Sequence, residues 1–174
     1  MDSDSTPHKL KAFDPLVAPR TRDRIEAVRQ YVSLVGNTHS ILGWVEGPLA
    51  EYVDLRGLDN AMVDLIEEPS RFHEAAQVIV DCAIAFARPQ IEAGADVIGV
   101  GDAAASLIGP DLYRRHVLPW QQKLLAAIHN LGETRAPAPL PGGKGVKIKL
   151  HICGNIAAIA PHLAESGADI IDVD

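Results

Sequence analysis

The sequence contains only two cysteines, Cys82 and Cys153, and has no long apolar run. Two cysteines cannot form a disulfide framework, so the cysteine content does not indicate an oxidising compartment. No segment approaches the roughly 18 consecutive apolar residues of a membrane-spanning helix. The opening stretch MDSDSTPHKLK is polar where a secretory signal would have its apolar core. These absences predict a soluble protein of the cytoplasm with no membrane partner.

Positive charge is also scarce, with 16 Lys and Arg against 23 Asp and Glu and a formal net charge of -7. This balance argues against a nucleic-acid-binding surface. The P-loop, the GxGxxG motif and the serine-hydrolase motif GxSxG are absent as well, which disfavours nucleotide binding and serine hydrolysis. What is present is an average globular composition, 47% hydrophobic and 22% charged, over 174 residues, the length of a single domain.

Hydrophobic periodicity predicts helices that alternate with short apolar strands. Residues 1–19 lack such a period and are expected to form a loose amino-terminal arm. The predicted helices cover 22–35, 60–67, 70–93, 110–131 with an interruption at Pro119, and 155–166; the predicted strands cover 39–45, 95–101, 146–152 and 169–173; a flexible loop covers 133–145. Because such alternation builds right-handed βαβ units, we expect a parallel α/β sheet.

One pattern occurs twice, as IEAGADVIGVGD over residues 91–102 and as LAESGADIIDVD over residues 163–174. Each copy is a helix end, a glycine cap, an apolar strand and a closing aspartate. The sequence holds about four strands, whereas a closed (β/α)8 TIM barrel needs about 250 residues. Since the chain stops at the tip of an apolar strand, we predict that residues 20–174 are a partial barrel, truncated at the carboxyl end. The alternative is a complete half-barrel that pairs into a homo-oligomer.

Polar side chains gather where the predicted strands end. Glu46 follows the first strand, Asp102 the second, and His151 and Cys153 the third. In barrels and in open α/β sheets, ligands bind at the carboxyl ends of the strands. The pattern therefore favours an enzyme whose site lies at this end of the sheet.

The sharpest of these features is the segment His151-Ile152-Cys153. Residues i and i+2 of a strand point to the same side, so the imidazole and the thiol could share one ligand. Zinc prefers these two ligand types, and its catalytic sites often combine three protein ligands with one open position. The alternative is a buried thiol beside a histidine that a backbone carbonyl satisfies.

The carboxylates allow two interpretations each. Asp102 precedes the small-residue stretch AAASLIGP and either lines a ligand site or caps the helical turn that follows it. Glu46 could accept a proton, orient a ligand or pair with an arginine such as Arg56. Asp172 and Asp174 point the same way from the last strand, and are either functional or the polar end of a truncated element.

Several other residues are weaker candidates. The histidines are interpreted as solvated or packing side chains, Cys82 as a small core residue, and Trp44 and Trp120 as core aromatics rather than as pocket walls. The histidines in question are His39, His73, His116, His129 and His162.

Three segments together resemble the uroporphyrinogen decarboxylase superfamily: WVEGPLAEYVDLRG (44–57), QIEAGADVIGVGDAAASLIGPDLYRRHVLPW (90–120), and HICGN with ESGADIIDVD near the carboxyl end. They are most similar to its zinc-containing, corrinoid-dependent branch, which includes the methylcobamide:coenzyme M methyltransferases. The resemblance covers residues 20–174 and implies a TIM barrel.

The resemblance also implies a chemistry. In that branch the HxC pair, here His151 and Cys153, supplies two zinc ligands, and a cysteine far downstream, beyond Asp174, completes the set. Zinc there binds an acceptor thiol, lowers its pKa and presents the thiolate to the methyl group of methylcobamide. This predicts zinc and a corrinoid as cofactor and co-substrate, a corrinoid protein or free corrinoid and a small thiol as partners, and Glu46 and Asp102 as catalytic residues of the pocket.

Two alternatives to methyl transfer remain open. The decarboxylase branch acts in porphyrin biosynthesis without a metal and binds a polycarboxylate tetrapyrrole through arginines and one aspartate. Its RQAGR stretch is absent here, its serine falls on Ala103, and Tyr52 is out of register with its tyrosine. The other alternative is an inactive fragment that acts as a binding subunit through an open sheet edge.

Overall fold

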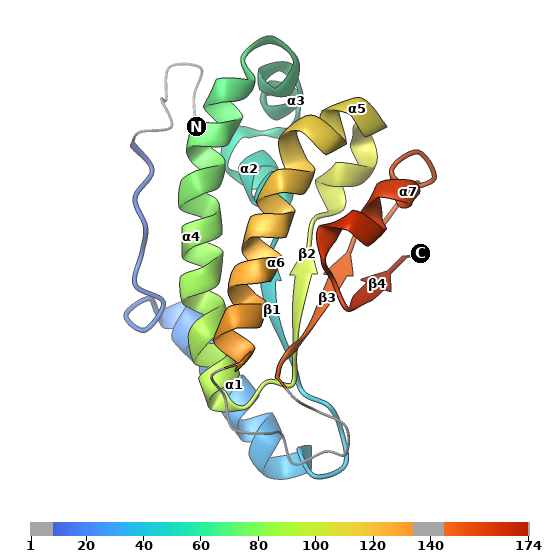
Figure 1. The fold of residues 1–174 in the computed structure, drawn as a ribbon. Helices are drawn as coiled ribbons and strands as arrows, with labels where there is room; N and C mark the ends of the chain where they lie inside the picture. The colour runs from blue at the N-terminus through green and yellow to red at the C-terminus, as the bar shows by residue number, and fades with distance from the viewer. Residues whose placement is uncertain (1–8, 134–144, 174) are drawn as a thin grey trace.

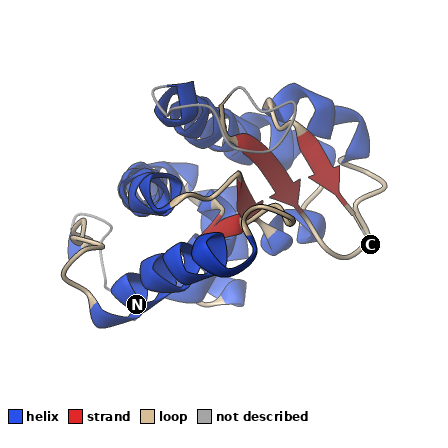
Figure 2. Cartoon of the chain, turned by 90° about the horizontal axis from the view of Figure 1, so that it is seen from below, coloured by secondary structure: helices blue, strands red, loops and turns tan. Residues whose placement is uncertain are grey.

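The computed structural model describes residues 9–133 and 145–173. Its centre is a four-stranded parallel sheet in the order β1-β2-β3-β4 (Figure 1). The strands are β1 (Leu42–Glu46), β2 (Val97–Gly101), β3 (Lys147–His151) and β4 (Ile170–Asp172). All three pairings are parallel, and Figure 2 shows neighbouring strands rotated against one another as a twisted sheet bordered by helices. The prediction of four parallel strands is confirmed.

Helices connect consecutive strands, as parallel pairing requires. The α-helices are α1 (Pro19–Val35), α2 (Pro48–Arg56), α3 (Leu58–Glu67), α4 (Pro69–Ala93), α5 (Pro110–Leu112), α6 (Leu118–Glu133) and α7 (Ala160–Leu163). Shorter turns are the 3₁₀ segments η2 (Ala103–Leu107) and η4 (Ala164–Ser166) and the π turn η3 (Tyr113–Val117). In the described part of the chain, no helix is long and apolar enough to cross a bilayer.

Two helix predictions need correction. The helix expected over 155–166 is reduced to α7 and η4, because the Asn155 side chain accepts a hydrogen bond from the Ala157 N–H and starts a turn instead. Pro161 then fits only the first turn of α7, where its missing N–H does no harm. The expected break at Pro119 is the π turn η3, after which α6 continues through that proline. Most of the loop predicted at 133–145 lies outside the described residues.

The hydrophobic core lies between the sheet and helices α4 and α6. Val45, Ile98, Val100, Ile148 and Leu150 are buried on this face of the strands, which explains why buried and more exposed residues alternate along β1 and β3. The next residues along each strand point to the opposite face, which these helices leave uncovered. The sheet therefore has one packed face and one open face.

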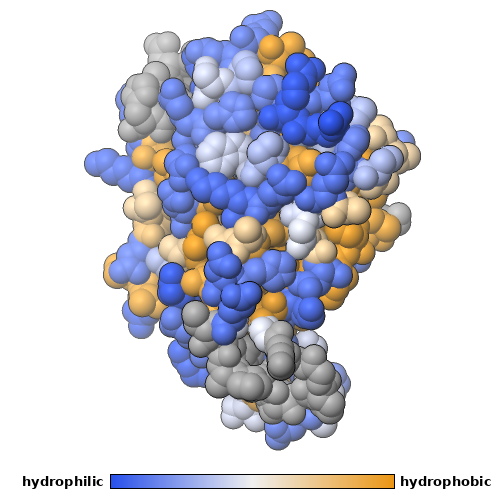
Figure 3. All heavy atoms as spheres, viewed as in Figure 1, coloured by the Kyte–Doolittle hydropathy of each residue, from blue (hydrophilic) through white to orange (hydrophobic). Residues whose placement is uncertain are grey.

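Hydrophobic side chains are also exposed at the β4 end of the sheet. Ile170, Ile171 and Val173 are 43%, 38% and 49% exposed. Figure 3 shows hydrophobic residues gathered on the side of the molecule where β4 lies. This edge pairs with β3 on one side only, as expected for a partial barrel.

Candidate functional site

The strand register brings four residues into one row at the carboxyl end of the sheet. Glu46 pairs with Gly101, Gly101 with His151, and His151 with Asp172. Directly registered residues of neighbouring strands lie on the same face, so these side chains share the open face of the sheet. The structure thus brings together three polar residues that are far apart in the sequence.

Trp44 lies in the preceding row, on the same open face. A Cβ atom added at Gly99 or Gly101 would come within 3.0 Å of its indole, so the ring lies directly over the two glycines of β2. Its Nε1 donates a hydrogen bond to Oε1 of Glu46 at 2.9 Å, and its ring centroid lies 6.2 Å from that of His151. Trp44 is therefore part of the site, and its interpretation as a core aromatic is wrong.

His151 ends β3 and has one unsatisfied buried nitrogen. Its Nδ1 lies 3.3 Å from Oδ2 of Asp172 but makes no hydrogen bond with any described group. The Lys149 ammonium lies 2.6 Å from the same Asp172 oxygen and lowers the pKa of that carboxyl group. Lys149 and His151 thus share one oxygen of the Asp172 carboxylate, with Lys149 in the shorter contact.

Cys153 lies two residues beyond the end of β3 and is a half-buried free thiol. The backbone turns at Gly154, whose φ of 92° is unfavourable for other residues, and this turn packs against Ser106 of η2. Within residues 9–133 and 145–173, no three His, Cys, Asp or Glu side chains converge as a metal site would require. Zinc ligation by His151 and Cys153 stays a prediction.

Asp102 has no exposed surface. Its Oδ1 accepts a hydrogen bond from the Ala50 N–H at 2.7 Å, in the first turn of α2, and its Oδ2 accepts one from Gln121 Nε2 at 2.8 Å. The backbone N–H of Asp102 donates to the His151 carbonyl at 2.9 Å. Burial raises the pKa of Asp102 to about 6. Its side chain makes no capping bond to η2, so the alternative of a cap on the following turn is wrong.

The close approach of Asp102 to α2 depends on a glycine. A Cβ at Gly47 would overlap the Asp102 side chain, so only glycine allows the strand-to-helix turn after β1 to pass this close. Gln121 is fixed in turn by the hydroxyl of Tyr113, which donates to its Oε1 at 2.6 Å. Asp102 therefore joins the ends of β1, β2 and β3 to α6.

Glu46 is exposed and does not pair with Arg56. The Arg56 Nε instead lies 2.7 Å from Oδ2 of Asp64, which also accepts a hydrogen bond from Tyr52 at 2.6 Å. These three side chains are buried between α2 and α3. The alternative of an ion pair between Glu46 and Arg56 is wrong, and Glu46 is left facing a cleft.

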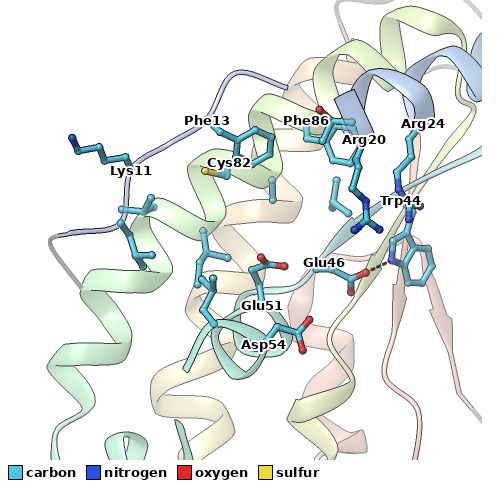
Figure 4. Close-up of a pocket in the computed structure, with 17 residues that line it drawn as sticks. Lys11, Phe13, Arg20, Arg24, Trp44, Glu46, Glu51, Asp54, Cys82 and Phe86 are labelled. Carbon is cyan, nitrogen blue, oxygen red and sulfur yellow. Dashed lines mark hydrogen bonds between the residues drawn. The ribbon is translucent and has the colours of Figure 1, made fainter. Parts of the chain in front are cut away.

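A cleft of about 580 Å³ opens beside β1 (Figure 4). Its walls come from the segment before α1, from α1 itself, and from β1, α2 and α4. Glu46 and Trp44 join it to the open face of the sheet. The other charged lining residues, which sequence reasoning missed, are Lys11, Arg20, Arg24, Glu51 and Asp54. The one sequence feature that could have indicated this cleft is the spacing of Arg20 and Arg24, which are four residues apart and therefore lie on one face of a helix.

A second cluster lies on the helices, away from the sheet end. Trp120 Nε1 donates to His73 Nδ1 at 2.8 Å, and His73 Nε2 lies 3.0 Å from His116 Nδ1. Burial lowers the pKa of both histidines. The interpretation of these histidines as packing side chains fits this arrangement, although the chain of ring contacts was not predicted.

The four parallel strands, their helical connections and the polar row at the carboxyl end define part of a TIM-barrel enzyme fold. Over residues 2–174 the sequence matches the family Uroporphyrinogen decarboxylase (URO-D), and the chain belongs to this family. The resemblance noted from the sequence segments is thereby confirmed.

The relatives include both branches of the superfamily. The chain is 31% identical over 159 residues to a methylcobamide:CoM methyltransferase of Methanosarcina barkeri, covering 88% of this chain and 42% of that protein. It is 32% identical over 174 residues to the uroporphyrinogen decarboxylase of Microcystis aeruginosa, covering 95% and 45%. A solved methyltransferase from Methanosarcina mazei matches with a TM-score of 0.75 and 26% identity, over 90% of this chain and 42% of that one. The chain spans less than half the length of these relatives.

Proposed function

We propose that this protein takes part in zinc-dependent methyl transfer between a corrinoid and a thiol acceptor. Support comes from the similarity to methylcobamide:CoM methyltransferases in sequence and to a methyltransferase in structure. The observation that carries the proposal is the buried Nδ1 of His151, which has no hydrogen-bond partner among the described groups and lies at the end of β3. A buried imidazole nitrogen without a partner is unusual unless it binds something.

His151 and Cys153 would supply two of the three protein ligands that a catalytic zinc site uses. His151 would supply an imidazole nitrogen and Cys153 a thiolate, the two ligand types that zinc prefers. Asp172, 3.3 Å from the Nδ1 of His151, would stay held by Lys149 beside the bound metal. When bound, zinc would lower the pKa of the acceptor thiol and so supply the thiolate for methyl transfer.

Trp44, Glu46 and Asp102 would shape the site around this chemistry. Trp44 covers the two glycines of β2 and would give that part of the open face an apolar surface. Its hydrogen bond fixes the Glu46 carboxylate at the rim, where it could take the proton that the acceptor thiol releases. Asp102, through its backbone bond to His151, would act as a positioning residue rather than touch the substrate.

The corrinoid, free or carried by a separate protein, would approach the open face from the carboxyl end of the strands. That face carries the Trp44 and His151 rings and is not covered by α4 or α6. Ligands of parallel α/β folds approach from this side, so the methyl group and the acceptor would meet over His151.

Native mass spectrometry of the protein purified from its own cells tests the proposal. We expect one zinc per chain, retained in the control variants Cys82→Ser and His162→Asn and lost in Cys153→Ser and His151→Asn. Methyl transfer from methylcobalamin to coenzyme M, followed by the cobalamin absorbance, should fall with the zinc content. A Cys153→Ser variant that transfers methyl groups at the normal rate would exclude the zinc-thiolate mechanism.

Uroporphyrinogen decarboxylation is the second candidate, favoured by the 28–32% identity to decarboxylases over as many as 174 residues. It predicts a metal-free protein that binds a polycarboxylate porphyrinogen whether or not Cys153 is replaced. Release of carbon dioxide from uroporphyrinogen by metal-free protein would establish it. A protein that shows neither activity but binds another subunit through the β4 edge would be the inactive fragment.

A further inference from the structure

The cleft beside β1 contains charges of both signs that form no ion pair with one another in the segments that the structure describes. Arg20 and Arg24 come from the first two turns of α1, and Figure 4 shows the Arg20 guanidinium directed toward the side of the cleft where Glu46 lies. Across the described part of the chain, neither arginine side chain forms an ion pair or a hydrogen bond. The two guanidinium groups are therefore available to an anion.

The opposite side of the cleft is acidic. Glu51 and Asp54 of α2 join Glu46 there, and Figure 4 shows the carboxylates of Glu51 and Asp54 near one another. Partial burial, followed by repulsion from Asp54 and Glu46, raises the pKa of Glu51. Within the described residues, none of Glu46, Glu51 and Asp54 forms an ion pair with a basic side chain, so both sets of charges in the cleft are available to a ligand.

The wall between the two sides is apolar. It is formed by one face of α4, with residues Val78, Ile79, Cys82, Ala83 and Phe86. The cleft volume of about 580 Å³ lies within the range of small-molecule sites, which typically combine such a wall with a few polar groups that fix the ligand's orientation. A carbon skeleton could pack on α4 while charged groups at its end reach both sides.

We propose that this cleft binds a small zwitterion of the amino-acid type, with its carboxylate on Arg20 and Arg24 and its ammonium on Glu51 and Asp54. A simple anion would bind the arginines but be repelled by the three carboxylates. A simple cation would bind the carboxylates but be repelled by the arginines. Only a ligand with both charges complements both sides. If the proposed methyl transfer is also correct, an amino-acid thiol bound in the cleft would serve as an acceptor in addition to coenzyme M, and this extension alone rests on that proposed function.

Isothermal titration calorimetry with three matched probes tests the proposal on the full chain. The probes are L-methionine, 4-(methylthio)butanoate, which lacks the ammonium, and 3-(methylthio)propylamine, which lacks the carboxylate. All three lack a thiol, and the protein is treated with EDTA, so the result does not depend on zinc. Because each charge-assisted contact is worth about tenfold or more in affinity, we expect methionine to bind at least tenfold more tightly than either partial probe.

Variants assign the two ends of the ligand. Arg20→Gln combined with Arg24→Gln removes both contacts to the carboxylate, so it should weaken the binding of methionine and of the butanoate by more than about tenfold and not weaken the binding of the amine. Glu51→Gln should weaken methionine and the amine and leave the butanoate unchanged or tighter. The controls are Arg29→Gln on the far part of α1 and the exposed Asp59→Asn on α3, neither of which lines the cleft. Circular dichroism melts verify that each variant is folded.

The outcomes separate this site from the proposed methyl transfer. Equal binding of methionine and the butanoate would replace the zwitterion site by a simple anion site, and an absence of binding by all three probes would overturn the proposal. Methyl transfer to coenzyme M without methionine binding would contradict the cleft alone. Methionine binding by a protein without methyl transfer would support the cleft while contradicting the proposed function.

Discussion

The indole nitrogen of Trp44 donates a hydrogen bond to Glu46, two residues further along the same strand, while the indole ring lies over Gly99 and Gly101 of the neighbouring strand. One side chain thus fixes the rim carboxylate and covers the middle of the open face. The absence of side chains at Gly99 and Gly101 makes room for the ring. The position of Trp44 therefore depends on the neighbouring strand as much as on its own.

Gly101→Ala should displace Trp44, because the added methyl group would overlap the ring. We expect a changed Trp fluorescence spectrum and a loss of stability of about 1–3 kcal/mol, the usual penalty for overpacking. Gly109→Ala is the matched control, since a Cβ there meets no atom within 4 Å. An unchanged spectrum in Gly101→Ala would show that the ring does not lie over β2.

Asp64→Ala should be among the most destabilising single changes between α2 and α3. It leaves the buried Arg56 without its carboxylate and removes the acceptor of the Tyr52 hydroxyl. Breaking a buried ion pair from one side costs about 3–5 kcal/mol, which urea denaturation would measure. Glu26→Ala removes the exposed pair with Arg29 and should cost less than about 1 kcal/mol. If the two variants lose similar amounts of stability, burial does not make the Arg56–Asp64 pair more important than the exposed Glu26–Arg29 pair.

Asp102→Ala should destabilise the packing of α2 and α6 against the end of β2, where the Asp102 side chain connects them. The N–H of Ala50 and the amide of Gln121 would both lose their buried acceptor, at about 1–3 kcal/mol for each unsatisfied group. Asp102→Asn keeps the shape and one acceptor oxygen, so we expect it to retain more stability in thermal unfolding. If the alanine variant is as stable as the asparagine variant, these hydrogen bonds do not hold α2 and α6 against the end of β2.

The His73–His116 pair should make the protein less stable as the pH falls. Burial lowers the pKa of both rings below the value of about 6.5 for an exposed histidine. The unfolded chain therefore binds more protons than the folded one below about pH 6.5, and the free energy of unfolding decreases as the solution is acidified. A proton on His73 Nδ1 would also displace the hydrogen bond from Trp120.

Chemical denaturation between pH 8 and pH 5.5 measures this effect as the difference between the wild type and His73→Asn/His116→Asn. The comparison is needed because Asp102, with its raised pKa, contributes in the opposite sense and is present in both proteins. We expect the wild type to lose more stability on acidification than the double variant. Parallel pH profiles would show that the histidine pair contributes nothing.

The strands and the polar row could be predicted from the sequence because both depend on local patterns. Buried apolar runs mark the strands, and in parallel sheets polar residues at the strand ends meet at one edge. Glu46 and His151 were therefore placed correctly at the ends of their strands. The prediction of a TIM barrel came from the resemblance of three separate segments to the family.

Contacts set by turns and tertiary packing could not be predicted in this way. Arg56 pairs with Asp64 because the chain reverses at Gly57, with φ of 83°, and brings α3 back against α2. Asp102 bonds to α2 rather than to its own turn because Gly47 allows the close approach. The charged cleft draws on five separate segments, so no stretch of sequence carries its signal.

The π turn over Tyr113–Val117 has a consequence for the direction of side chains in α6. An α-helix turns by about 100° per residue, so residues eight apart point about 80° away from each other, whereas residues seven apart are nearly aligned. A π turn takes up one extra residue. Tyr113 and Gln121, eight positions apart, are thereby brought into line, and their side chains meet at 2.6 Å. A single inserted residue in this helix thus determines that Gln121 faces Asp102 instead of the solvent.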